Sequence, residues 1–209
     1  MQPESVETLK LGRIAALENA SSLVEEAELL HKHQHWARTI FLCQIAGEEL
    51  GKFVILTTAA VELTVSAEGF DWKKLGAHLR SHREKLTVIS VHESVFWEPP
   101  PDHFPTYFAE LKKTIEILEN GKQHAIYSDI QDGNYYSPTW IYNEGIATNA
   151  LNWAKGRLRL INELNSLQGI ETMTPESIVA AWERIGIPTP PVYGSKNLRT
   201  TPKPPAGPA

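Results

Sequence analysis

The sequence predicts an all-α protein, and three observations support this prediction. No proline occurs between Glu4 and Glu98, which permits long helices because an interior proline costs about 3 kcal/mol. In the same region apolar residues recur mostly three and four positions apart, which is the period of an amphipathic helix. No run of alternating apolar and polar residues is long enough to require a strand.

The first half of the chain is expected to form three long helices. The apolar spacing predicts a first helix over residues 6–32 and a second over residues 36–65, and the polar run 31–35 forms a turn between them. Asp71 is suited to cap a third helix that continues to about residue 95. Three prolines at positions 99–101 end that helix.

The second half is expected to hold further helices separated by a turn. A fourth helix is predicted over residues 106–125 and a fifth over residues 140–167. The segment 128–134 between them is rich in turn residues. A short sixth helix is expected to open at Thr174, because Pro175 suits the first turn of a helix.

Prolines are concentrated at the end of the chain. Seven of the fourteen lie in residues 188–209, and a segment of that composition cannot build a core. We therefore expect a helical domain over residues 1–187 and a Pro-rich, extended or disordered tail over residues 188–209.

Composition and charge restrict the functional class. The single cysteine, Cys43, excludes an internal disulfide framework and fits a reducing compartment. The N-terminus lacks the pattern of a signal peptide, and ionisable residues interrupt the most hydrophobic region, so we expect a cytoplasmic protein without membrane spans. A net charge of −5 argues against wholesale coating of nucleic acid. Residues 71–85 nevertheless form a local basic strip, which can contact phosphates or be a solvated helix face.

A charged segment inside the second predicted helix is the first candidate for a functional site. At about 100° per residue, Glu48, Glu49 and Lys52 share one face of that helix. An exposed pair of this kind contributes only a few tenths of a kcal/mol, roughly, to helix stability. The neighbouring Gly47 and Gly51 indicate a different setting, because glycine weakens a helix unless close packing requires it. Beside such a contact the charged residues would be partly desolvated and functionally relevant.

Histidines and a Tyr–Asp pair supply the other candidates. His78 and His82 have the spacing of a metal pair but lack the glutamate of an HExxH motif, so His82 is better suited to proton transfer or phosphate contact than to metal binding. An exposed, charged face is the alternative. Tyr127 and Asp129 could bring a phenol and a carboxylate to a cleft, or form an ordinary helix end. No Gly-rich phosphate loop or GxSxG motif is present, and we expect no metal and no cofactor.

Taken together, these residues resemble the AbiV-type abortive infection family of the HEPN superfamily. The resemblance rests on three segments in the expected order between about residues 15 and 140. The first is similar to the family's helix hairpin, runs from Asn19 to Leu56 and includes residues 46–52. The second, residues 81–85, contains an H-x-x-K element from His82 to Lys85, and the third, residues 122–129, contains a Y-x-D element from Tyr127 to Asp129. It implies a HEPN-like bundle of about five to six helices and a role in phage defence through arrest of growth or translation. The site residues that it implies are Glu48, Glu49, Lys52, His82, Lys85, Tyr127 and Asp129.

The HEPN resemblance also implies a homodimer and a metal-independent ribonuclease, but the chain departs from the usual ribonuclease signature. No arginine is followed, after four to six residues, by histidine. Two hypotheses therefore stay open. The first is an RNA-directed toxin in which His82 is the acid or base, Lys52 and Lys85 contact phosphate, Glu48 or Glu49 orients Lys52, and Tyr127 and Asp129 complete the cleft. The second is a non-catalytic protein that docks on the translation machinery or on a phage-encoded activator, with a purely structural role for the charged segment as a third, blander possibility.

Overall fold

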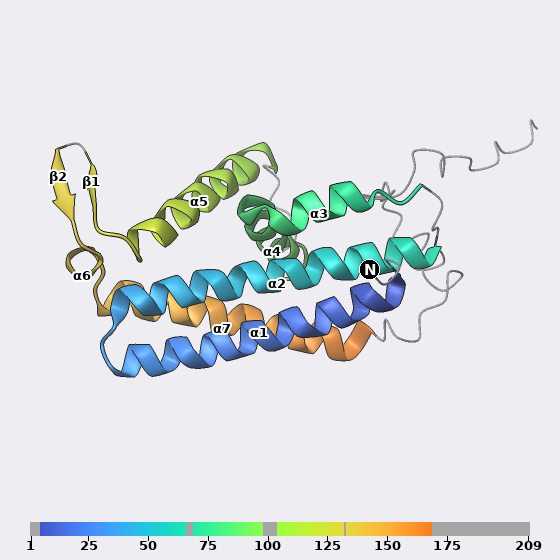
Figure 1. Ribbon diagram of the computed structural model, residues 1–209, viewed down its shortest axis with the longest axis horizontal. Coiled ribbons are helices and arrows are strands. Elements are labelled where there is room, and N and C mark those ends of the chain that lie inside the picture. The colour runs from blue at the N-terminus through green and yellow to red at the C-terminus, as the bar shows by residue number, and fades with distance from the viewer. Residues whose placement is uncertain (1–4, 66–68, 98–103, 132, 169–209) are drawn as a thin grey trace, which may run out of the picture.

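The computed structural model describes residues 5–65, 69–97, 104–131 and 133–168. Two long helices, α1 (Val6–Lys32) and α2 (Trp36–Val65), run antiparallel, and α7 (Glu144–Gln168) packs against both of them (Figure 1). A second group of helices covers α2 from the other side: α3 (Trp72–Arg80), α4 (His82–Trp97) and α5 (Phe104–His124). The prediction of an all-α fold is confirmed.

Local sequence signals explain where the first helices begin and end. Ser5 caps α1, because its side chain accepts a hydrogen bond from the backbone N–H of Thr8. The turn to α2 contains Gln34 in the left-handed region at φ 61°, and it lies in the polar run that predicted a turn. Asp71 caps α3 as expected, since its side chain accepts a hydrogen bond from the N–H of Lys74.

The prediction of one continuous helix from residue 71 to residue 95 was wrong. The chain leaves helical geometry at Ser81, whose φ of −78° and ψ of 115° are extended. The hydroxyl oxygen of Ser81 then accepts a hydrogen bond from the N–H of Glu84 and starts α4. Serine serves this purpose because its short side chain competes with the helical backbone for hydrogen bonds. The break places His82 in the first turn of a new helix.

The turn-rich segment after α5 contains a small hairpin that the sequence did not predict. Strands β1 (Asp129–Gln131) and β2 (Asn134–Tyr136) pair antiparallel, with Gly133 at φ 77° between them, and the short helix α6 (Pro138–Ile141) follows. The described residues thus contain seven helices rather than the expected five to six, because of the break at Ser81 and the added α6. The predicted sixth helix at Thr174 and the Pro-rich tail lie outside the described residues.

Small residues bring the helices of the core close together. Ala20, Ala46 and Ala154 are fully buried in the clusters that join α1, α2 and α7, and Ala59 is fully buried in the cluster that joins α2 to α1 and α3. Larger side chains fill the space between these contacts, among them the fully buried Leu50. In the part of the chain that the structure describes, no helix combines the length and apolarity that crossing a membrane requires.

Candidate functional site

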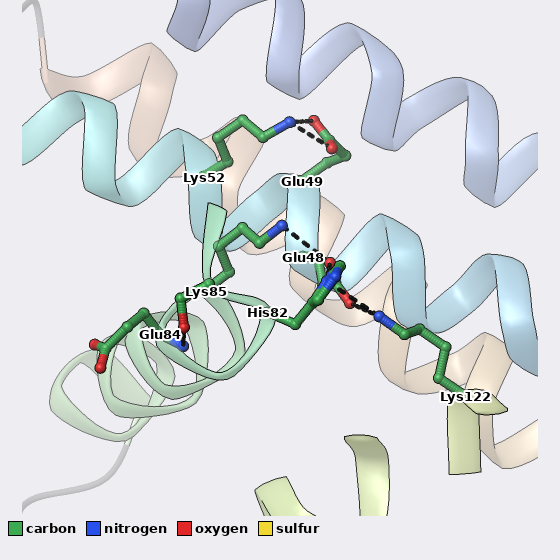
Figure 2. Close-up of polar contacts among 8 residues, drawn as sticks. Glu48, Glu49, Lys52, His82, Glu84, Lys85 and Lys122 are labelled. Atoms are coloured by element: carbon green, nitrogen blue, oxygen red, sulfur yellow. Dashed lines mark hydrogen bonds and ion pairs between the residues drawn. The ribbon is translucent and has the colours of Figure 1, made fainter. Parts of the chain in front are cut away.

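The buried carboxylate of Glu48 on α2 forms hydrogen bonds and ion pairs with side chains from two other helices. Glu48 is 3% exposed. Its Oε1 accepts a hydrogen bond from Lys122 Nζ at 2.7 Å, and its Oε2 lies 3.0 Å from Lys85 Nζ and 2.5 Å from His82 Nδ1 (Figure 2). His82 and Lys85 come from α4 and Lys122 from the last turn of α5. We call these four residues the Glu48 cluster.

Two glycines on α2 allow the neighbouring helices to reach this position. A Cβ at Gly51 would lie under 3.0 Å from the backbone carbonyl oxygen of Lys85, so α4 can approach α2 this closely only at a glycine. A Cβ at Gly47 would lie equally close to the indole ring of Trp153 on α7. The close packing that these two glycines predicted is therefore confirmed.

The break at Ser81 orients the two α4 residues of the cluster. His82 and Lys85 are three positions apart and share one face of α4, so both side chains point at the same carboxylate (Figure 2). Their exposure differs: Lys85 and Lys122 are buried, whereas the side chain of His82 is 56% exposed. Within the described residues, the Glu48 cluster therefore reaches solvent through the imidazole of His82.

The protonation state of Glu48 follows from two opposing effects. Burial raises the pKa of its carboxyl, but hydrogen bonds from Lys122, His82 and Lys85 outweigh burial and hold that pKa below its usual value. Glu48 is therefore ionised and can only accept hydrogen bonds. The 2.5 Å contact then requires the proton on Nδ1 of His82, which leaves the lone pair of a neutral ring on Nε2.

The position of the proton on His82 also determines which atom accepts the hydrogen bond from Lys122. The ammonium of Lys122 lies 3.1 Å from Nδ1, but a protonated Nδ1 cannot accept a hydrogen bond. The carboxylate of Glu48 is thus the acceptor for Lys122. Two ammonium groups face one carboxylate, so the cluster carries an excess of at least one positive charge. Such an excess beneath an exposed imidazole favours an anionic ligand at that position.

The other predicted α2 residues form a separate pair. Lys52 Nζ donates to both carboxylate oxygens of Glu49, at 2.6 and 2.7 Å. Figure 2 shows this pair apart from the Glu48 cluster. Glu49 rather than Glu48 orients Lys52, and the side chain of Lys52 is 30% exposed.

Tyr127 and Asp129 do not join the Glu48 cluster within one chain. Both are exposed, and the carboxylate of Asp129 accepts a hydrogen bond from the neighbouring backbone N–H of Ile130. Figure 1 shows β1 beyond the end of α5 and distant from α4. Their assignment to the site stays a prediction.

Lys122 is not among the site residues that the sequence predicts. Its position in the last turn of α5, where a cation suits the negative end of a helix, is an ordinary structural signal. Lys122 lies 74 residues from Glu48 in sequence, so its role becomes visible only when α5 packs beside α2.

No group of three or more His, Cys, Asp or Glu residues that could hold a metal comes together in the described ranges. Three histidines occur in the turn segment 31–35. Nε2 of His31 lies 2.9 Å from the hydroxyl oxygen of Thr148, and His33 and His35 are exposed.

Residues 8–159 of the chain match the model of the HEPN family that is described as AbiV. That span includes the whole Glu48 cluster, the Glu49–Lys52 pair and the hairpin. No curated protein and no solved structure matches the chain.

Proposed function

Because the chain belongs to the AbiV family of HEPN proteins, which suggests abortive infection as a defence against phage, we propose that it is an RNA-directed toxin. In this proposal the protein cleaves RNA without a metal and so arrests growth or translation of the infected cell. The Glu48–His82 contact carries the proposal.

The contact supplies a base at the protein surface. The ionised, buried Glu48 accepts a hydrogen bond from Nδ1–H of His82 and so fixes the ring orientation. The side chain of His82 is 56% exposed, and a neutral ring with the proton on Nδ1 has its lone pair on Nε2. Metal-independent cleavage of RNA begins with removal of the proton from a ribose 2′-hydroxyl. His82 Nε2 is suited to that step. The 2′-oxygen then bonds to phosphorus while the bond from phosphorus to the 5′-oxygen breaks, which gives a 2′,3′-cyclic phosphate, and the leaving 5′-oxygen takes up a proton from water.

The charge of the cluster supports a phosphodiester as substrate. Charge develops on the phosphate oxygens as the ribose oxygen attacks, and positive groups already fixed in place stabilise it. Lys85 and Lys122 are held by Glu48 and need no rearrangement to act in this way. The partly exposed Lys52, oriented by Glu49, provides a cation that can contact a neighbouring phosphate directly.

The second candidate function is a protein that arrests growth by docking on the translation machinery or on a phage-encoded activator. One observation favours it: Lys85 and Lys122 are buried and share one carboxylate, which is also what a network that fixes helix packing requires. In that case the Glu48 cluster would determine the shape of a binding surface.

Cleavage of labelled RNA by purified protein, with and without EDTA, separates the two candidates. We expect cleavage that resists chelation, that is lost in His82→Ala and that is retained in His33→Ala, which removes an exposed histidine outside the cluster. Cleavage of equal rate in His82→Ala would contradict the assigned base. Binding of ribosomes or of a phage protein without RNA cleavage would favour the second candidate.

A further inference from the structure

A pocket lies at the end of the molecule where Figure 1 shows α6 beside the turn between α1 and α2. Its volume is about 310 Å³, and its walls come from that turn, the first turn of α2, the segment after α5, and α6 with the residue that follows it. Sites for small ligands are concave, start at roughly this volume, and combine apolar walls with a few polar groups. The pocket is therefore large enough to hold a small molecule.

The charged groups of the pocket are cationic. Arg38 and His35 line it, and none of the described residues in its walls is acidic. Within the described part of the chain, neither side chain forms a hydrogen bond or an ion pair. The donors of the Arg38 guanidinium are thus available to a ligand, and their planar fork matches the oxygens of a phosphate. His35 provides a further donor.

Two hydroxyl groups lie beside these cations. Ser128, from the segment after α5, and Thr139, on α6, both line the pocket. The oxygen of the Thr139 hydroxyl lies 3.0 Å from that of Ser137. A hydroxyl group can donate one hydrogen bond and accept two, so both residues can still bond to a ligand. A phosphate, with several acceptor oxygens, suits this group of donors.

The aromatic part of the wall is held in place by residues that do not line the pocket. The ring of Trp36 meets that of His31 edge to face, with 5.0 Å between the centroids. The hydroxyl of Tyr142 donates a hydrogen bond to the carbonyl oxygen of Gly121 at 2.9 Å, and burial raises the pKa of this phenol, so it stays protonated. Aromatic side chains that are fixed before binding lower the entropic cost of holding a flat ligand ring.

We propose that this pocket binds a small aromatic molecule that carries a phosphate group. Arg38, His35 and the Ser128 hydroxyl hold the phosphate, and the ligand ring lies against Trp36 and Tyr142. The pocket is separate from the Glu48 cluster, because Arg38 and Glu48 are ten residues apart on α2, or about 15 Å along its axis. The inference therefore stands whether or not the protein cleaves RNA.

Equilibrium dialysis with phenyl phosphate tests the ligand class. We expect the wild type to bind phenyl phosphate, to bind inorganic phosphate more weakly because it lacks the ring, and not to bind phenol, which lacks the phosphate. Absence of phenyl phosphate binding at millimolar concentration would overturn the proposal. Binding of phenol as tight as that of phenyl phosphate would overturn it too, since the cations would then have no role.

Substitutions test whether the ligand occupies this pocket. Arg38→Gln should weaken binding of phenyl phosphate by about tenfold, because it removes charge-assisted hydrogen bonds. Thr139→Trp should abolish binding by filling the pocket, with circular dichroism confirming that both variants are folded. Arg159→Gln is the matched control: it removes one positive charge from a side chain that is 74% exposed further along α7, and it should bind as the wild type does.

Two results with these proteins would contradict the assignment. Unchanged binding in either Arg38→Gln or Thr139→Trp would place the ligand elsewhere and overturn the proposal. Displacement of phenyl phosphate by a single-stranded RNA oligonucleotide with hydroxyl groups at both ends would assign the pocket to nucleic acid instead of a small molecule.

Discussion

Gly51 and the backbone of Lys85 lie so close that a Cβ at position 51 would be under 3.0 Å from the Lys85 carbonyl oxygen. This contact sets the separation of α2 and α4 at the level of the Glu48 cluster. It explains why a glycine stands three residues after Glu48 in an otherwise well-formed helix: the missing side chain allows His82 and Lys85 to reach the buried carboxylate.

Gly51→Ala is therefore expected to destabilise the protein. Alanine favours a helix over glycine by about 1 kcal/mol, but the added methyl group would push the α4 backbone away, at a cost of about 1–3 kcal/mol or more. Urea denaturation measures the difference. Gly156→Ala on α7 is the control, because a Cβ there meets no atom within 4 Å and should give a small gain in stability. A gain of equal size at position 51 would contradict the close approach of α4.

Loss of the Glu48 charge is expected to cost far more than an ordinary surface substitution. Glu48→Gln leaves the ammonium groups of Lys85 and Lys122 buried without their counter-charge, which typically costs about 3–5 kcal/mol. A second substitution, Lys122→Met, should recover part of that loss, because it removes one of the stranded charges. Denaturation of the two single variants and the double variant measures this coupling, and simple additivity would show that Glu48 and Lys122 do not interact.

The pKa of Glu48 predicts how stability depends on pH. Because burial is outweighed by hydrogen bonds from Lys122, His82 and Lys85, the folded-state pKa lies below the unfolded-state value near 4.5. The stabilising contribution is thus fully present above the unfolded pKa and is lost as pH falls through the folded pKa. Thermal unfolding from neutral to acidic pH should show this loss in the wild type and a smaller one in Glu48→Gln. Equal loss in both proteins would place the acid sensitivity in other carboxylates.

Cys43 is expected to resist thiol reagents in the native protein. It is fully buried, and burial raises the pKa of its thiol to about 12, so little thiolate exists at neutral pH. Labelling with a maleimide should be slow in buffer and rapid in concentrated urea, and mass spectrometry can follow it. Rapid labelling under native conditions would show that α1, α2 and α7 separate readily around this position.

The sequence predicted the long elements well and the short ones poorly. The bounds of α1 and α2 follow from apolar spacing and from the absence of proline over more than ninety residues. The break at Ser81 carries no glycine or proline signal, and its serine forms a cap only because the chain turns there. The hairpin strands span three residues each, too few for an alternating pattern to be recognised.

At the candidate site, Glu48 could be predicted from the sequence, but the helices that cover it and the cation Lys122 could not. Helical spacing shows that Glu48 and Lys52 lie on nearby faces of one helix, but it does not show which neighbouring helix covers each of them. Packing decided this: Glu48 is covered by α4 and α5, whereas Lys52 remains partly exposed beside Glu49. Lys122 could not be found from local pattern, because its partner is 74 residues away.

The order of the cluster along the chain has a consequence for protein synthesis. Glu48 is made first, His82 follows 34 residues later, and Lys122 follows 74 residues later. At about 5–20 residues per second, the ribosome needs about 4–15 seconds to pass from the carboxylate to its last cation. During that interval the nascent chain holds Glu48 without Lys122, and the complete cluster cannot assemble. Under the proposed function, the ribosome that makes the chain would therefore carry a product that is not yet active.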